Sequence, residues 1–122
     1  MNKRLSKIAY EVTQLSGTEK PFSGKYYNFF ENGTYFCVCC NNELFDSSKK
    51  FKSSSGWPSF FDKKNSDAII YIEDSSHGMQ RTEVRCGKCN AHLGHVFNDG
   101  PKPTFKRYCI NSVAMSFKKN EL

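Results

Sequence analysis

The run CGKCNAHLGHVFNDG, residues 86 to 100, contains the pattern that most constrains the fold. It opens on a Cys-x2-Cys pair, Cys86 and Cys89, and a second pair of the same spacing lies upstream at Cys37 and Cys40. Two such pairs can place four thiolates at the corners of a tetrahedron, the geometry that Zn²⁺ takes in structural sites. Because the pairs are far apart in sequence, the ion would join two distant β-segments. The spacing therefore predicts a structural zinc ion held by these four cysteines.

Other interpretations of the same cysteines remain open. One pair by itself suits a redox dithiol, and two pairs suit two disulfides in an oxidised protein. Cys39 offers a Cys-x-Cys alternative to Cys40 as a ligand, although its simplest role is that of a small, partly buried apolar side chain. The N-terminal segment lacks the apolar stretch of a secretory leader, so we expect a cytoplasmic protein with reduced thiols, which favours zinc.

The composition suits one folded domain over residues 1–122. Charged residues make up 25% of the chain and aromatic residues 15%, so aromatic packing should supply much of the core. The net charge of +6 raises the possibility of a nucleic-acid partner. The basic residues are scattered, however, without any run of five or six like charges, and no segment is apolar enough to span a membrane. We therefore expect neither a nucleic-acid nor a membrane partner.

Hydrophobic periodicity predicts a mainly β protein with a short helix near its N-terminus. Apolar residues recur at helical spacing at Leu5, Ile8, Val12 and Leu15. After a break containing glycine and proline, β-branched and aromatic residues predict strands at 34–38, 68–72 and 79–85. A turn follows at 98–103, and residues 107–117 form one long alternating run.

Cys109 stands apart from the two cysteine clusters, in the run RYCIN at 107–111. Alternation along a strand puts Arg107, Cys109 and Asn111 on one face. A guanidinium beside a thiol favours the thiolate, which is the nucleophilic form, and the Asn111 amide can orient a neighbour. Taken alone, such a cysteine is more often a structural core residue.

The two histidines of the opening run favour a catalytic role for Cys109. Strict alternation would put His92 and His95 on opposite faces, but a bulge at Gly94 would bring both to one side. Two imidazoles near a thiol supply acid–base chemistry close to neutral pH. His77, in a turn-like segment, is better interpreted as structural. Trp57 lies in a loop pattern and can either wall a small apolar pocket or cover the core.

These residues belong to stretches that together resemble the methionine-R-sulfoxide reductase B family. The stretches cover nearly the whole chain and include SGWPSFF at 55–61 and RYCINS at 107–112. The resemblance implies two antiparallel sheets with a short helical N-terminal region, stapled by zinc at Cys37, Cys40, Cys86 and Cys89. It implies that Cys109 is the nucleophile. It assigns Trp57 and Phe97 to substrate binding, and it adds to the active site His92, His95, Asp99, Arg107 and Asn111.

The implied reaction is the reduction of peptide or protein methionine-R-sulfoxide to methionine. The Cys109 thiolate would attack the sulfoxide sulfur while His95, or His92 acting with a bound water, protonates the oxygen. Asp99 would orient a histidine, and Arg107 would stabilise the thiolate. The products are methionine and a sulfenic acid on the cysteine, without an organic cofactor.

Two positions depart from the family pattern. Ser55 stands where many members have a resolving cysteine, so we expect an external thiol, with thioredoxin as the leading candidate, to reduce the sulfenic acid directly. Cys39 is the only spare thiol, and it adjoins a zinc ligand. Phe105 stands where the family often has glycine, which predicts a changed backbone or pocket rim near Arg107.

A non-catalytic alternative is a zinc-stapled β-module that binds nucleic acid or a protein partner. The positive charge and the many aromatic residues would suit such a module. This alternative gives no role to Cys109, to its Arg and Asn neighbours or to the histidine pair.

Overall fold

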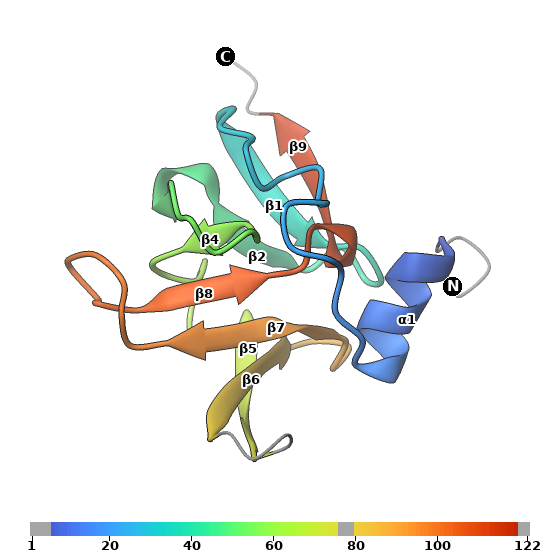
Figure 1. The fold of residues 1–122 in the computed structure, drawn as a ribbon. Coiled ribbons are helices and arrows are strands. Elements are labelled where there is room, and N and C mark those ends of the chain that lie inside the picture. Colours follow the sequence, from blue (N-terminus) through green and yellow to red (C-terminus); the bar gives the residue numbers. More distant parts are fainter. Residues whose placement is uncertain (1–5, 76–79, 120–122) are drawn as a thin grey trace.

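A computed structural model describes residues 6–75 and 80–119 of the chain (Figure 1). Within these residues, the strands form an antiparallel sheet of three in the order β2-β1-β9 and one of six in the order β3-β4-β8-β7-β6-β5. Their bounds are β1 Gly33–Cys37, β2 Glu43–Asp46, β3 Lys50–Phe51, β4 Ser59–Phe60, β5 Ile69–Asp74, β6 Arg81–Cys86, β7 His92–Phe97, β8 Arg107–Ile110 and β9 Met115–Lys119. The predicted fold class, mainly β with two antiparallel sheets and a short helix near the N-terminus, is confirmed.

The individual predicted strands are also found, with shifted bounds. The segments 34–38, 68–72 and 79–85 correspond to β1, β5 and β6, although residue 79 lies outside the described residues. The predicted turn at 98–103 lies in the connection between β7 and β8. In the described part of the chain, no helix has the length and apolarity needed to cross a membrane.

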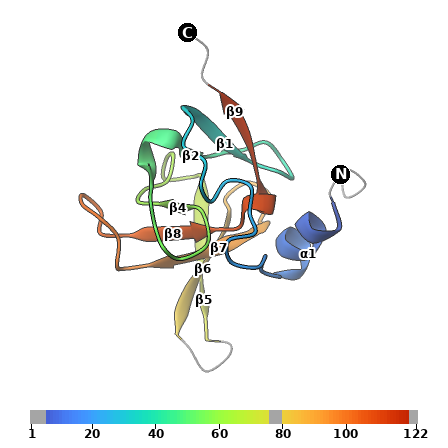
Figure 2. The same ribbon diagram turned by 45° about the horizontal axis from the view of Figure 1, so that its top comes forward.

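Helix α1, Lys7–Leu15, lies beside the beginning of β7 (Figures 1 and 2). Its inward stripe was only partly predicted, because the buried side chains are those of Ala9, Val12 and Thr13. Ile8 is 41% exposed and Leu15 is 64% exposed, while Leu5 lies outside the described residues. The stripe at i, i+3 and i+4 is narrow, and a small residue and a threonine occupy it in place of the expected large apolar ones.

The predicted single run at 107–117 is wrong, because a short 3-10 turn, Ser112–Ala114, divides it between the two sheets. β8 belongs to the larger sheet and β9 to the smaller. The Ser112 hydroxyl accepts a hydrogen bond from the Tyr26 N–H at 3.1 Å, and the Val113 N–H donates to the Glu19 carboxylate at 3.1 Å. Long-range hydrogen bonds therefore hold a corner where the local pattern is that of a continuous strand.

Aromatic side chains connect the two sheets. Tyr35 of β1 and Phe45 of β2, from the smaller sheet, are fully buried with Phe60 of β4, from the larger sheet. The rings of Phe45 and Phe60 stack with centroids 4.3 Å apart, and Tyr35 meets Phe60 edge to face at 5.1 Å. Because each pair spans the sheets, aromatic packing fixes their relative position, as the composition predicted.

Candidate active site and metal centre

The four predicted zinc ligands come together at the junction of the two sheets. The Sγ atoms of Cys37, Cys40, Cys86 and Cys89 all lie within 4.8 Å of one another. Two of the separations, Cys37 to Cys89 and Cys40 to Cys86, are 3.6 Å. A tetrahedron with Zn–S bonds of about 2.3 Å has edges of about 3.8 Å, so the donor set fits a tetrahedral thiophilic ion. The prediction that these four residues can hold a metal ion is confirmed.

Each pair sits in the same kind of tight turn. The Asn41 N–H donates to the Cys37 carbonyl and the Asn90 N–H to the Cys86 carbonyl, both at 2.9 Å. Both asparagines have φ near 65°, the left-handed conformation that this residue type tolerates. Gly87 allows a close approach, since a Cβ there would lie 2.1 Å from the Asp67 carbonyl oxygen. The turns thus aim the two sulfurs of each pair at one point.

Cys39 lies outside this cluster of ligands. Its side chain is buried, and its sulfur accepts a hydrogen bond from the Gln14 side-chain amide at 3.4 Å. All six cysteines are free thiols in the structure, so neither a disulfide nor a Cys-x-Cys ligand set is observed. The interpretation of Cys39 as a small buried side chain therefore fits its surroundings.

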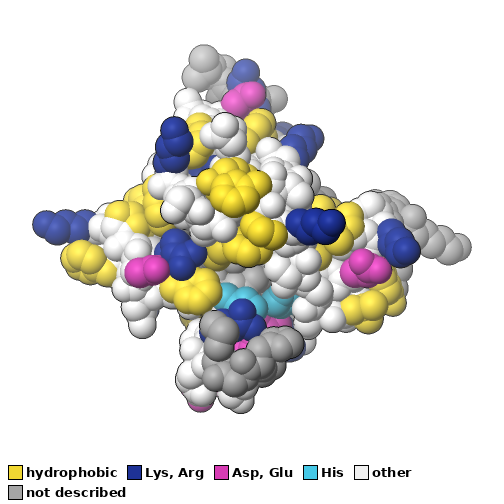
Figure 3. Space-filling view, in the orientation of Figure 1, with side chains coloured by type: hydrophobic (Ala, Val, Ile, Leu, Met, Phe, Trp, Pro, Cys, Tyr) yellow, Lys and Arg dark blue, Asp and Glu magenta, His cyan; other side chains and the backbone are white. Residues whose placement is uncertain are grey.

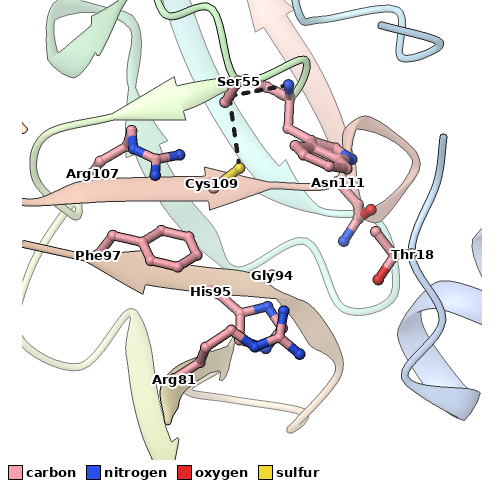
Figure 4. A pocket seen from close by; sticks show the side chains of 10 residues that line it. Thr18, Ser55, Arg81, Gly94, His95, Phe97, Arg107, Cys109 and Asn111 are labelled. Carbon is pink, nitrogen blue, oxygen red and sulfur yellow. Dashed lines mark hydrogen bonds between the residues drawn. The ribbon is translucent and has the colours of Figure 1, made fainter. Parts of the chain in front are cut away.

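A cavity of about 260 Å³ opens over β7 and β8 (Figure 4). The space-filling view shows histidine side chains in a recess of this face, beside apolar and basic side chains (Figure 3). Its lining residues are Thr18, Ser55, Trp57, Arg81, Gly94, His95, Phe97, Arg107, Cys109 and Asn111. Most of the predicted site residues are thus gathered here, with His92 and Asp99 outside the lining. His77 lies outside the described residues.

Cys109 lies in β8 between β4 and β7, where its direct cross-strand partners are Ser59 and His95. Its thiol donates to the Ser55 hydroxyl oxygen, with 3.8 Å between sulfur and oxygen. Burial raises the pKa of the Cys109 thiol, while the Ser55 hydroxyl and the Arg107 guanidinium oppose that rise. The expectation that Arg107 favours the thiolate is right in sign but is outweighed by burial, so the resting form is the thiol.

The two histidines lie together, but they differ in access to the cavity. Their ring centroids are 5.8 Å apart. His95 lines the cavity and its Nε2 lies 3.0 Å from the Asp74 carboxylate. His92 is only 4% exposed, its Nδ1 lies 2.6 Å from the Glu83 carboxylate, and its Nε2 has no hydrogen-bond partner among the described residues. Burial lowers the pKa of His92 and so favours the neutral ring, although Glu83 acts in the opposite direction.

The bulge that joins the histidines is one residue away from the predicted position. The register of β7 against β6 shifts between Gly94, which pairs with Val84, and His92, which pairs with Arg85. Leu93 is therefore the extra residue. Gly94 serves a different purpose, because a Cβ at that position would lie 2.0 Å from the Cys109 carbonyl oxygen. The glycine lets the strand with the nucleophile approach closely.

Asp99 binds Arg107, and the expectation that it orients a histidine is wrong. The guanidinium donates to its two carboxylate oxygens at 2.8 and 3.2 Å, and this pairing lowers the pKa of Asp99. The same guanidinium lies 4.5 Å from the ring centroid of Phe97. Fixed on both sides, Arg107 is held at the edge of the cavity. The acids beside the histidines are Glu83 and Asp74, which sequence reasoning missed because their proximity depends on strand register.

Sequence reasoning also missed Glu19, which connects two walls of the cavity. Its N–H donates to the Asn111 side-chain oxygen at 2.9 Å, and its carbonyl accepts from the Trp57 indole at 3.0 Å. Its carboxylate accepts from the Val113 N–H, and the residue is only 4% exposed. Glu19 lies in a segment containing glycine and proline that predicts only a break between elements. A charged residue in such a segment gives no local sign that it is buried.

Phe105 is not among the residues that line the cavity, so its side chain does not form the pocket rim, and the expected change of backbone stays a prediction. Its side chain is 54% exposed and is not among the lining residues. Its φ is 60°, a left-handed conformation that favours glycine. The position thus has a backbone conformation that a glycine adopts easily, and the phenylalanine side chain lies outside the cavity lining.

Comparison with known proteins shows that the sequence is similar to those of reductases. A family model described as the SelR domain matches residues 5–119. A relative from Thioalkalivibrio sulfidiphilus, named peptide methionine sulfoxide reductase MsrB, is 56% identical over 118 residues, which are 97% of this chain and 86% of the relative. Relatives of the same name come from Photorhabdus laumondii, 56% identical over 94% of this chain and 85% of the relative, and from Pseudomonas fluorescens, 59% identical over 87% and 82%.

Proposed function

Because this chain belongs to the SelR family, together with relatives named peptide methionine sulfoxide reductases, we propose that it reduces methionine-R-sulfoxide in peptides and proteins to methionine. The single observation that supports this most is the pairing of Cys109 with His95 on adjacent strands, both lining one cavity. The likeness to reductases over nearly the whole chain does not support the non-catalytic β-module. The family match also favours one reductase domain over residues 1–122.

The cavity supplies a binding surface for the sulfoxide. Trp57, held by its indole hydrogen bond to Glu19, offers an apolar wall for the methyl group. The Phe97 ring lies under the Arg107 guanidinium and lines the same cavity (Figure 4). We assign Trp57 and Phe97 to substrate binding because both rings line the space above the thiol.

The chemical step transfers oxygen from the substrate to the enzyme. The Cys109 sulfur, deprotonated as it reacts, attacks the sulfoxide sulfur, and His95 donates a proton to the sulfoxide oxygen. The attack joins the two sulfurs, and the proton lost by the thiol replaces the one that His95 gives up. The protonated oxygen then passes to the Cys109 sulfur as the bond between the sulfurs and the S–O bond of the substrate break, which leaves methionine and a sulfenic acid on Cys109. The substrate sulfur gains the two electrons that the cysteine sulfur loses. The buried His92 ring packs against His95 and positions it. Asn111 and Arg107 line the cavity and define its edges.

An external thiol then restores the enzyme. Its thiolate attacks the Cys109 sulfenic sulfur, water leaves, and a second thiol resolves the mixed disulfide. Ser55, whose hydroxyl accepts the hydrogen bond of the Cys109 thiol, has no sulfur with which to form an internal disulfide. We propose thioredoxin or a comparable dithiol as reductant, in the reducing cytoplasm where the free cysteines persist.

We propose zinc as the ion at the four-cysteine cluster, because four thiolates in a tetrahedral set are the ligands that Zn²⁺ prefers. Bound there, zinc would supply structural cross-linking. None of the four ligands lines the catalytic cavity. The cysteines themselves join the end of β1 to the end of β6, and thus one sheet to the other.

The test is a turnover assay with zinc-loaded protein, separate R and S epimers of a peptide methionine sulfoxide, and excess dithiothreitol. Consumption of the R epimer alone is expected, and Cys109→Ser should abolish it. Unchanged reduction by Cys109→Ser, or no reduction by folded zinc-loaded protein, would contradict the proposal.

A further inference from the structure

A second hollow adjoins the catalytic cavity. It has a volume of about 390 Å³ and shares Ser55 and Arg107 with the cavity as lining residues. Its remaining wall consists of Phe51 and Lys52, the serines that follow them, and Asp99. The two spaces therefore meet at the border formed by Ser55 and Arg107, directly beside the Cys109 thiol.

The charged side chain of this hollow that has no partner within the described part of the protein is a lysine, so the hollow carries an unpaired positive charge. Its one carboxylate, on Asp99, is engaged by both arms of the Arg107 guanidinium. Lys52 is exposed, and it makes no ion pair or hydrogen bond through its side chain within residues 6–75 and 80–119. The ring of Phe51, half-buried beside it, adds an apolar surface. An acidic side chain with an apolar neighbour is the chemistry that complements such a surface.

A substrate that is part of a polypeptide must use a surface outside the cavity. A space of about 260 Å³ accommodates the oxidised side chain, whereas the main chain on each side of the methionine has to leave the cavity along the protein surface. The hollow at Phe51 and Lys52 lies on such an exit, because it shares part of its wall with the catalytic cavity. Its half-buried ring and unpaired ammonium distinguish it from an ordinary solvated face.

We propose that this hollow binds the residues next to the oxidised methionine and that Lys52 selects polypeptides with an acidic side chain there. The inference rests on the proposed reductase function and adds a specificity determinant to it. The occupant is the substrate polypeptide itself. Lys52 lies outside the catalytic cavity, so it should affect which peptides bind and should not affect the reaction of Cys109 with the sulfoxide.

The experiment compares short blocked peptides that contain one methionine-R-sulfoxide and place glutamate, glutamine or lysine at each of the nearest positions on either side. For the wild-type protein with dithiothreitol, kcat/KM should be about threefold higher for glutamate than for lysine at one or more positions, the effect of one exposed ion pair. The preference should shrink at high salt. Lys52→Glu should reverse it.

Lys118→Glu is the matched control, because it makes the same change of charge on β9, in the other sheet. It should keep the wild-type preference. Equal kcat/KM for all peptides, or an unchanged preference in Lys52→Glu, would overturn the proposal. It would also be overturned if Lys52→Glu slowed recycling by a protein dithiol and left peptide selection intact, since the hollow would then serve the reductant. Absence of any turnover by the wild-type protein would instead contradict the reductase function.

Discussion

The Ser55 hydroxyl oxygen lies 3.8 Å from the Cys109 sulfur at the border of the catalytic cavity (Figure 4). This relationship places an unreactive oxygen where a second sulfur could meet the nucleophile with only a small adjustment, since a disulfide needs a sulfur separation of about 2.05 Å. The route by which the enzyme is restored after each turnover therefore depends on the identity of residue 55.

Ser55→Cys should change how the Cys109 sulfenic acid is reduced, from attack by an external thiol to formation of a disulfide within the chain. After one turnover on the R epimer without reductant, wild-type protein should carry a dimedone-reactive sulfenic acid on Cys109. The variant should instead form a disulfide between the introduced thiol and Cys109, because the resolving sulfur is adjacent. Intact and peptide mass spectrometry distinguish the two products. Ser54→Cys, one residue away and exposed, should keep the dimedone adduct; persistence of the adduct in Ser55→Cys would contradict the prediction.

Nucleophile ionisation should make alkylation of Cys109 faster at alkaline pH. Burial raises the pKa of Cys109 above the ordinary value of 9.0, so the thiol is the main form at neutral pH and the thiolate fraction grows as pH rises. Arg107→Gln removes an opposing positive charge, which should raise the pKa further and slow the neutral-pH reaction by about tenfold. Iodoacetamide labelling of Cys109, followed by peptide mass spectrometry across pH, measures the shift. An unchanged labelling profile in Arg107→Gln would show that the guanidinium does not act on the thiol.

The two histidines should respond differently to substitution. His95→Gln removes the proposed proton donor and should lower the first-turnover rate by about a hundredfold or more, with little change in thiol labelling. His92→Gln alters a buried group outside the cavity, and should mainly lower stability by about 1–3 kcal/mol through its contact with Glu83. Single-turnover kinetics and thermal unfolding separate the effects. The assignment fails if His92→Gln loses more activity than His95→Gln while remaining folded.

Glu19 should matter through its carboxylate anchor. Glu19→Ala leaves the N–H of the half-buried Val113 without its acceptor, which should cost about 1–3 kcal/mol of stability. Loosening of the segment should also raise KM, because the Glu19 carbonyl holds Trp57. Trp57 is the only tryptophan, so its fluorescence reports the change directly. Glu19→Gln retains an acceptor and should have the emission and KM of the wild-type protein. Identical spectra and KM for Glu19→Ala and Glu19→Gln would refute the link between the Glu19 side chain and Trp57.

Loss of the metal should affect stability before chemistry. Structural zinc bound by cysteines contributes on the order of 10 kcal/mol to folding, comparable to the whole stability of a domain. Cys86→Ser should therefore lose the ion and unfold well below the wild-type temperature, as measured by metal content and thermal denaturation. Cys39→Ala should retain one zinc per chain. Retention of full stability by metal-free protein would argue against a structural ion.

Features encoded over a few consecutive residues were predictable. The spacing of Cys37 with Cys40, and of Cys86 with Cys89, is set within single turns, and the structure shows four sulfurs meeting at one point. The strands and the aromatic core follow from alternation and residue type, which also act locally. The family resemblance supplied the roles of Cys109 and of the residues around it, and the structure brings most of them to one cavity.

Features that depend on pairing between distant strands were decided by the tertiary structure. Asp74 and Glu83 meet the histidines because β5, β6 and β7 align in one register, and no short sequence pattern specifies that alignment. Asp99 pairs with Arg107 because the loop that follows β7 brings the carboxylate to the guanidinium at the start of β8. The sequence by itself determined which chemical groups are present and how each local turn aims them. Long-range packing determined which acid faces which base and which thiol is buried, since those energies arise only when separated segments meet.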